Sequence, residues 1–527
     1  MIMTTFRLSR KRTQALIRVL LVLCILALGN FVSVRIFARF DLTDQGVFTL
    51  SDASRRLAEG LDDRVTVTAY FTEDLPAPYN ATRRAVLDML NEYRAYAGAN
   101  LQYTFVNPTG DAGEQEARQQ GIPPVEVQVV EQDKFQVKRA FLGLVLQYED
   151  RKETIPVVQN LGSLEYDLSA AFKRLTTRTK KRVGYSEGHG ETPVQAWQRA
   201  YQELGRNYDL VPVNLSSASD IPRDLAALLV IAPASPFSDS AAAAIDRYIM
   251  GGGTAAFLLN RMNVNLNAQY RLAQPADVGL DKLLESYGTR VNADLVRDQQ
   301  CANITVMQQQ GLFQIQSQVP FPYLPNASAF SDNPVVKDLQ SLIFFFASSI
   351  DTSFAAPRGL TAEVLVRSSE RSGRATGITL VDPFQQFQLS DWSEQRLPLA
   401  AAVTGSFSSA FAGTLLAPPV VQSPSTRIIV VGDGDFMKDE LAGSRGNATF
   451  FINIVDYLAD DAGLITIRSK NIAQPPLDVL DDGTRWTMRG RKVGEGNSYH
   501  SSFLVDEADA LGRITEYQAK VERTAFI

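Results

Sequence analysis

The chain has 527 residues, a net charge of -6 at neutral pH and a pI near 5.3, with 45% hydrophobic and 21% charged residues. The acidic balance argues against nucleic acid as a partner, and the apolar content is typical of a globular protein with about two or three domains. The chain has only two histidines, and its two cysteines, Cys24 and Cys301, lie far apart. We therefore expect no disulfide framework, no metal and no cofactor.

An apolar segment near the amino end, residues 15–37, is predicted to span a membrane. It carries no charge from Val19 to Val34, and at about 1.5 Å per residue it reaches about 34 Å, enough for a hydrocarbon core of about 30 Å. The arm before it, residues 1–14, is basic, and no acidic residue precedes Asp41. Because positive charge stays on the cytoplasmic side, we predict a single-pass protein with its amino terminus inside and its bulk outside.

The same segment fits a second interpretation, a cleaved signal peptide. The stretch from Ala27 to Gly29 has the small-x-small pattern of a cleavage site, although the apolar run continues beyond it to Ile36. Under either interpretation, the rest of the chain is exported.

Residues 41–178 alternate short strands and helices. Ser51 precedes a run of period 3.6 and predicts an N-capped helix. Strands are then expected at 65–72, 101–108, 125–132, 135–150 and 153–158, and helices at 81–97, 111–120 and 161–177. With the last three strands forming a meander, this order is that of a thioredoxin-like fold. The position of the thioredoxin Cys-x-x-Cys holds Glu73 to Pro78, so no thiolate pair is available and the domain is predicted to be a scaffold.

Residues 180–468 predict a doubly wound, Rossmann-like α/β sheet, because strands and helices alternate at suitable lengths. Expected strands are 182–185, 209–215, 224–234, 254–260, one around Val291 and 427–436, and expected helices are 194–205, a helix N-capped by Ser238, 281–288 and 447–458. The pattern weakens in a strand-rich insertion at about 300–425, where Ile343 to Phe346 is interpreted as core. Residues 469–527 form a polar tail with an amphipathic helix near 505–521.

Several stretches in this order resemble the auxiliary subunits of gliding-motility-type ABC transport systems, the GldG-like family. They are RFDLTDQGVFTLSDASRRLAEGL, RVGYSEGHGE, LLVIAPASPFSDSAAAAIDRYIMGGGTAAFLL, PLAAAVTG and IIVVGDGDF, and the resemblance covers about residues 15–468. It implies an extracytoplasmic (periplasmic) protein of the bacterial inner membrane, standing beside an ABC permease and its ATPase. It also implies that the second domain resembles the class I glutamine amidotransferase fold.

The chain departs from that family in two places. The resemblance implies a second membrane helix near the carboxyl end, and nothing after Ile467 is apolar enough to span. A glutamine amidotransferase also needs a nucleophilic cysteine in a sharp strand–helix turn, and Cys301 is in no such turn. We therefore predict that the protein is not an enzyme.

Two glycine-broken loops are expected to meet at the carboxyl ends of the parallel strands, where open α/β sheets bind ligands. The candidate ligand-binding residues are Glu187, His189, Glu191, Asp433 and Asp435. They suit a small molecule, a glycan or a cation, or a hydrolase built on the imidazole and the carboxylates. The plainer alternative is that the histidine is a hydrogen-bonded turn residue and that the two aspartates cap the following segment.

The predicted function is that of an anchored, non-ATPase accessory subunit of an ABC-type transport system. Its expected partners are the permease and ATPase subunits, the lipid bilayer and a small-molecule or glycan ligand. An extracytoplasmic hydrolase using His189 and a structural envelope protein remain the alternatives.

Overall fold

The structure is a computed structural model that describes Leu21 and residues 49–467, except 74, 76–78, 132–133, 159–160, 217–220, 267–270, 311–312, 338, 442–444, 461–462, 464 and 466. Apart from Leu21, the expected anchor lies outside the described residues, and so does the polar tail. Within the described ranges, no helix has the length and apolar character needed to cross a membrane.

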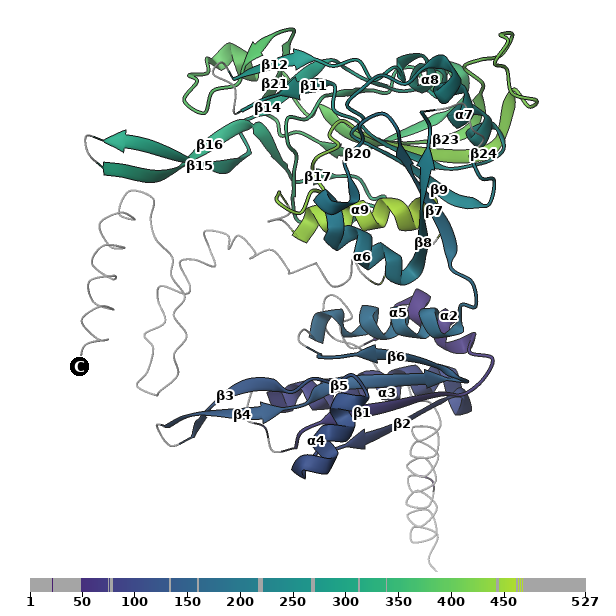
Figure 1. Cartoon of the computed structure of the whole chain (residues 1–527), viewed down its shortest axis with the longest axis vertical. Helices are drawn as coiled ribbons and strands as arrows, with labels where there is room; N and C mark the ends of the chain where they lie inside the picture. Colours follow the sequence, from purple (N-terminus) through teal and green to yellow (C-terminus); the bar gives the residue numbers. More distant parts are fainter. Residues whose placement is uncertain are drawn as a thin grey trace, which may run out of the picture. The chain divides into compact units, whose positions relative to one another are not determined.

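The first domain is a four-stranded sheet covered by helices (Figure 1). Its elements are α2 (Asp52–Glu59), β1 (Val65–Phe71), α3 (Tyr79–Ala97), β2 (Leu101–Val106), α4 (Gly110–Gln119), β3 (Val125–Glu131), β4 (Lys134–Ala140), β5 (Leu142–Tyr148), β6 (Arg151–Ile155) and α5 (Leu164–Thr176). The sheet order is β2-β1-β5-β6, with β1 parallel to β2 and antiparallel to β5. The predicted cap of the first helix is confirmed, since the Ser51 hydroxyl accepts a bond from the Ser54 N–H at 3.3 Å.

The two faces of this sheet are covered by different helices. Val67 on β1 packs in one core with Leu90 on α3 and Leu168 on α5. Its neighbour on the other face, Tyr70, packs with Ala117 on α4. Alternate residues of a strand point to opposite faces, so this single strand contributes to both cores.

One expectation for this domain is wrong. Strands β3, β4, β5 and β6 do not form one meander, because β3 and β4 pair only with each other among the described strands. The place beside β1 is taken by β5, whose residues are nearly all buried. A strand buried on both faces belongs inside a sheet, and β3 and β4 are left as a separate hairpin.

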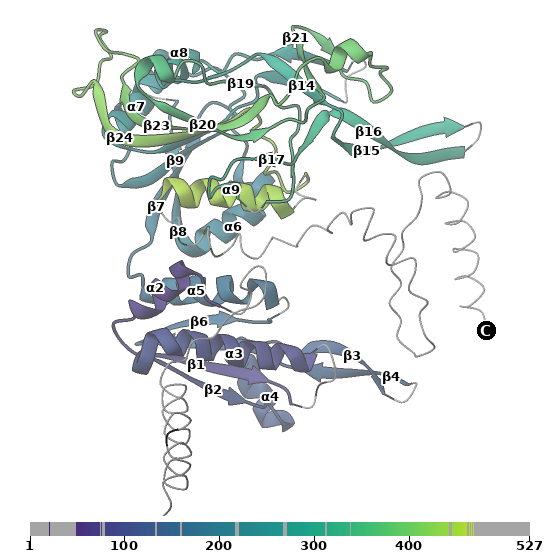
Figure 2. The ribbon, with the colours of Figure 1, turned by 180° about the vertical axis from the view of Figure 1, so that it is seen from behind.

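The second domain contains an eight-stranded sheet (Figures 1 and 2). Its elements are β7 (Lys181–Glu187), α6 (Gln198–Asn207), β8 (Tyr208–Asn214), β9 (Leu225–Ile231), α7 (Asp239–Met250), β10 (Ala255–Leu258), β11 (Met262–Val264), β12 (Leu272–Pro275), α8 (Asp281–Ser286), β13 (Arg290–Val291), β14 (Asp294–Asp298), β15 (Cys301–Gln310), β16 (Phe313–Ala327), β17 (Ala329–Phe330), β18 (Leu342–Ile343), β19 (Ile350–Asp351), β20 (Thr361–Arg367), β21 (Ser372–Thr376), β22 (Thr379–Leu380), β23 (Pro398–Ser408), β24 (Gln422–Val431) and α9 (Arg445–Leu458). The sheet order is β17-β20-β23-β24-β10-β9-β7-β8.

The part of this sheet from β24 to β8 is parallel throughout, as the sequence predicted. Helices α6 and α9 pack on one face, and α7 and α8 pack on the other. Ser238 caps α7, where its hydroxyl accepts a bond from the Ala241 N–H at 3.3 Å. The parallel strands are continuous apolar runs because both of their faces are covered.

The insertion is rich in strands, as the sequence predicted. Strands β17, β20 and β23 extend the main sheet in antiparallel pairings. The strand expected around Val291 is β13, which pairs with β19 and does not continue the parallel sheet. The long β15–β16 ribbon extends away from the rest of the domain (Figure 2).

A close backbone contact holds part of the insertion against the end of β24. The Ser348 N–H donates to the Gly432 carbonyl at 2.7 Å, and a Cβ at Gly432 would lie 1.9 Å from the Ser348 carbonyl oxygen. Only glycine permits this approach. The segment before Ser348 is therefore fixed beside the carboxyl ends of the parallel strands.

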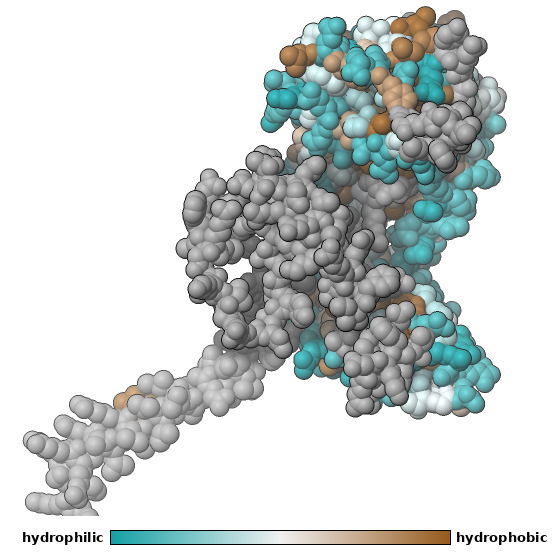
Figure 3. All heavy atoms as spheres, turned by 90° about the vertical axis from the view of Figure 1, so that its left-hand side faces the viewer, coloured by the Kyte–Doolittle hydropathy of each residue, from teal (hydrophilic) through white to brown (hydrophobic). Residues whose placement is uncertain are grey.

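On the face drawn in Figure 3, hydrophilic residues dominate the described surface, and hydrophobic residues are scattered among them. Single exposed apolar side chains are normal on soluble domains and mark no interface by themselves.

Candidate functional site

A pocket of about 760 Å³ opens at the carboxyl edge of the parallel sheet. It is lined by the loops that follow β7, β9, β10 and β24, together with residues from the insertion. The lining residues are Gly190, Glu191, Thr192, Pro193, Gln195, Ala196, Ala232, Pro233, Ala234, Asn260, Met262, Asn263, Val264, Asn265, Leu266, Ala276, Phe345, Phe346, Asp435, Lys438, Asp439 and Glu440. Along the chain the parallel strands have the order 2-1-3-4-5, and the loops after β7 and β9 flank the point where that order reverses, which is where such sheets bind ligands.

Glu191 contributes a buried carboxyl group to the pocket wall. Its side chain is only 4% exposed, and its Oε2 accepts a bond from the backbone N–H of His189 at 2.7 Å. Its Oε1 has no hydrogen-bond partner, and the nearest basic atom is Nδ1 of His189 at 3.8 Å. Both carboxylate oxygens of Glu191 therefore face His189, and Oε1 is shielded from the solvent in the pocket.

His189 lies behind the wall and does not line the pocket. Its ring stacks on Phe237, with 3.9 Å between the ring centroids. Its carbonyl accepts bonds from the N–H groups of Ala234 and Ser235 at 2.9 Å. The histidine thus joins the loop after β7 to the loop after β9, which agrees with the interpretation as a turn residue.

Asp433 is fully buried and does not line the pocket. Its two carboxyl oxygens accept bonds from the N–H groups of Phe345 and Asp435, both at 2.6 Å. Burial, followed by the nearby charge of Asp435, raises the pKa of Asp433 to about 8. The bond to Asp435 is the capping arrangement that the plainer interpretation predicted, and the bond to Phe345 connects β24 to the insertion.

Asp435 and Lys438 form an ion pair on the pocket wall. Their Oδ1 and Nζ atoms are 2.7 Å apart, and both side chains are about three-quarters buried. Asp439 accepts bonds from the N–H of Arg199 at 3.1 and 3.4 Å, and this caps the first turn of α6. The charges of these three pocket residues therefore have partners within the protein.

Two residues on the pocket wall have a strained backbone. Ala232, directly after β9, has a φ of 45°, and Phe346 has a φ of 56°. The N–H of Phe346 donates to the Tyr323 carbonyl at 3.0 Å, which helps to hold this conformation. Strained residues persist only where their surroundings fix them, and they are common at binding sites.

Of the five residues proposed from the sequence, two line the pocket, Glu191 and Asp435. His189, Asp433 and Glu187 do not line it, and Glu187 is exposed at the end of β7. The sequence reasoning missed Asn260, whose Oδ1 accepts a bond from the Gly434 N–H at 2.7 Å. Its position at the end of an apolar strand was a usable signal.

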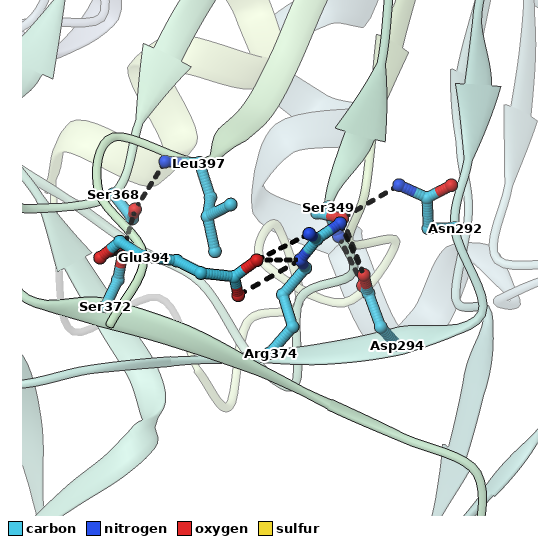
Figure 4. Close-up of polar contacts among 8 residues, drawn as sticks. All are labelled: Asn292, Asp294, Ser349, Ser368, Ser372, Arg374, Glu394 and Leu397. Carbon is cyan, nitrogen blue, oxygen red and sulfur yellow. Dashed lines mark hydrogen bonds and ion pairs between the residues drawn. The ribbon is translucent and has the colours of Figure 1, made fainter. Parts of the chain in front are cut away.

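A second polar cluster, with Asp294 and Ser349 buried and Arg374 and Glu394 partly exposed, joins β14 to the insertion (Figure 4). The Asp294 carboxylate accepts bonds from the N–H and hydroxyl of Ser349 at 2.8 and 2.6 Å, and its Oδ2 is 3.8 Å from Nη1 of Arg374. Arg374 also makes an ion pair with Glu394. Burial raises the pKa of Asp294. Because these groups bond to one another, the cluster stabilises the insertion and offers no site for a ligand.

Two protein families match parts of this chain. The family described as "ABC-type uncharacterized transport system" matches residues 180–456, and a domain of unknown function (DUF7088) matches residues 44–147. The chain belongs to this auxiliary family of ABC-type transport systems, and the resemblance noted from the sequence is confirmed at that level. The narrower GldG-like assignment stays a prediction.

Individual relatives add little about function. An uncharacterized protein of Borreliella burgdorferi is 23% identical over 456 residues, covering 84% of this chain and 86% of that protein. Among solved structures, the mmIFT52 N-terminal domain matches with a TM-score of 0.33 and 12% identity, over 53% of this chain and 96% of that one. The exo-beta-1,4-mannosidase Op5Man5 from Opitutaceae bacterium strain TAV5 matches with a TM-score of 0.24 and 8% identity, over 76% of this chain and 51% of that one. Scores this low support no conclusion about fold or activity.

Proposed function

We propose that this chain is a membrane-anchored, non-enzymatic accessory subunit of an ABC-type transport system, whose exported domains contact the permease and carry a ligand pocket. The observation that carries the proposal is the family match over residues 180–456. The charge-free segment from Val19 to Val34 and the basic arm before it support the anchor and its direction. ATP hydrolysis in such a system belongs to a cytoplasmic partner chain.

The two domains suit a role in binding. The sheet order β2-β1-β5-β6, with one parallel and two antiparallel pairings, supports a thioredoxin-like scaffold, and no cysteine occurs in that part of the sequence. The parallel strands of the second domain support the predicted amidotransferase-like core. The pocket at its carboxyl edge has the volume of a small-molecule site.

The hydrolase alternative would place His189 at the centre of the chemistry. Its ring instead stacks on Phe237, its side chain is 9% exposed, and it does not line the pocket. No contact among the described residues pairs this ring with a nucleophilic hydroxyl or thiol. The geometry thus favours the binding role.

Crosslinking followed by purification tests the partner. The full chain is crosslinked in intact cells of its native host and purified from detergent-solubilised membranes, and the captured proteins are identified by mass spectrometry. We expect an ABC permease and its ATPase, absent from a matched purification of an unrelated anchored protein. Recovery of the chain alone would contradict the accessory role.

Protease protection tests the topology. Protease added to spheroplasts should digest the domains, whereas a cytoplasmic control protein should survive until the cells are lysed. The intact mass of the purified chain separates an anchor from a cleaved signal peptide, because cleavage near Gly29 removes the segment. Domains that resist protease until lysis would refute export.

A further inference from the structure

We propose that the loop between β23 and β24, residues 409–421, docks on the permease of the transport system, in an apolar and uncharged recess of that partner. This inference rests on the proposed accessory function and adds the place and the chemistry of the contact. Three features support it: the apolar side chains on the loop, its lack of charge and the contacts that fix its shape.

The loop carries large apolar side chains on its surface. Leu415 is fully exposed, and Val420 and Val421 are 53% and 51% exposed. Figures 1 and 2 show the loop extending beyond the ends of β23 and β24. Exposed apolar side chains that gather on one projecting loop, unlike scattered ones, mark a binding surface, because a partner that covers them removes their contact with water.

The loop has no charged side chain. The sequence contains no Asp, Glu, Lys, Arg or His between Arg396 and Arg427, in a chain of which 21% of the residues are charged. The core of a protein–protein interface is depleted of charge, because a buried, unpaired charge loses its hydration. An apolar recess can therefore cover this loop without leaving a charge of the loop unpaired.

Contacts at its base hold the loop in shape. Asp246, which is fully buried in α7, accepts bonds from the Ser409 hydroxyl at 2.6 Å and the Ala410 N–H at 3.2 Å. The same carboxylate also accepts a bond from the Tyr287 hydroxyl at 2.7 Å. Phe411 is buried in the core that covers this face of the sheet. A loop that is ordered before binding loses little conformational entropy when a partner covers it.

The turn beside Leu415 is closed by its own hydrogen bonds. The Thr414 N–H and hydroxyl both donate to the Phe411 carbonyl, at 3.0 and 2.7 Å. The Leu416 N–H donates to the Thr414 hydroxyl, and the Ala417 N–H donates to the Thr414 carbonyl, both at 3.2 Å. Because these backbone donors have partners inside the loop, an apolar surface can cover them without leaving them unsatisfied.

These features favour a protein recess over a lipid surface or a second copy of the chain. Apolar segments that enter a lipid surface carry Lys and Arg for the headgroups, and the loop has neither, although Lys282 lies at its base with Nζ 4.8 Å from the centre of the Phe411 ring. A symmetric contact between two copies would bring two identical projections together, and neither offers the other a recess. The family match indicates a transporter component as the partner. Because the loop precedes β24, it lies at the edge of the sheet opposite the pocket, and docking there leaves the pocket open.

Crosslinking of the full chain in intact cells of its native host tests this inference when it is carried out with loop variants. Leu415→Asp and Val420→Asp place a charge on the loop, and each should lower the recovery of the permease about 10-fold or more relative to the parent. Leu389→Asp is the matched control, because Leu389 is also a highly exposed leucine, 90% exposed in another segment of the domain, and it should leave the recovery unchanged. All three residues are exposed, so urea denaturation should show the stability of the parent.

A photocrosslinker identifies what lies against the loop. Leu415→Cys is labelled in cells with a maleimide–benzophenone reagent, in a chain whose native cysteines are replaced (Cys24→Ser and Cys301→Ser), and Leu389→Cys is labelled as the control. We expect an adduct with the permease from position 415 and none from position 389. An adduct with lipid or with a second copy of the chain would overturn the inference. This measurement decides the question if Leu415→Asp fails to fold.

The outcomes separate this inference from the accessory role. If the parent recovers the permease and Leu415→Asp recovers as much, the loop is not the docking surface, and the accessory role stands. An equal loss in Leu389→Asp would show a general effect of added charge and would also overturn the inference. If the parent recovers no permease, the accessory role itself fails, and the inference fails with it.

Discussion

The stability of the second domain should fall as the pH rises, because Asp433 is buried with a proton. Burial and the charge of Asp435 raise the pKa of Asp433 from 3.8 to about 8. In the unfolded chain the carboxyl group has the ordinary pKa, so between these two values the folded state binds more protons. The free energy of unfolding therefore decreases as the pH rises towards the folded pKa, and the contribution is lost above it.

The expected size follows from the width of that window. The free energy of unfolding changes by about 1.4 kcal/mol for each pH unit over which only the folded state keeps the proton. Between about pH 6 and about pH 9 this applies to about two pH units, up to the folded pKa of about 8. We therefore expect the free energy of unfolding to fall by roughly 2–3 kcal/mol over this range. The two backbone N–H donors, from Phe345 and Asp435, oppose the shift but do not outweigh the loss of hydration.

Urea denaturation at about pH 6 and about pH 9 measures this change, with tryptophan fluorescence as the signal. Two of the three tryptophans of the chain, Trp197, which is fully buried in the core, and Trp392, lie in the second domain, so the change in signal on unfolding reports mainly that domain. Asp433→Asn cannot ionise and should be nearly insensitive to pH over this range. It should also be less stable at about pH 6 by about 1–3 kcal/mol, because its amide nitrogen faces a backbone N–H.

A second variant distinguishes the two causes of the shift. Asp435→Asn removes the neighbouring charge and so lowers the folded pKa of Asp433, and the loss of stability should be smaller and should end at a lower pH. If the parent and Asp433→Asn showed the same pH dependence, Asp433 would be ionised throughout, and the argument from burial would be wrong.

Two further predictions concern the backbone of the same domain. Gly432→Ala should destabilise the domain by about 3 kcal/mol or more in urea titrations, because the new Cβ would lie 1.9 Å from the Ser348 carbonyl oxygen. The control Gly205→Ala, in α6 with nothing within 4 Å of its Cβ, should stabilise the domain by about 0.5–1 kcal/mol. An equal change in stability for the two variants would refute the close contact. Ser238→Ala should lower the free energy of unfolding by about 1 kcal/mol, because it removes the cap of α7. The control Ser240→Ala, inside the same helix, should change it by less than about 0.5 kcal/mol. A difference between the two variants too small to measure would mean that the cap contributes nothing.

Local patterns of the sequence determined most of the elements and their order. The caps at Ser51 and Ser238, the helical periodicity and the continuous apolar strands predicted the two α/β domains, because these signals depend on neighbours within one or two turns. The rule that parallel strands end at one edge also brought Glu191 and Asp435 to the same pocket.

Only the tertiary structure decided how distant segments combine around that pocket. Phe345 and Phe346 lie on its wall because the insertion packs against Gly432, about 90 residues further along the chain, and no local pattern encodes that contact. The same packing places β17, β20 and β23 in the main sheet. It also separates Glu191, which lines the pocket, from the exposed Glu187 four residues earlier, since the direction of a loop side chain depends on the surfaces against which the loop packs.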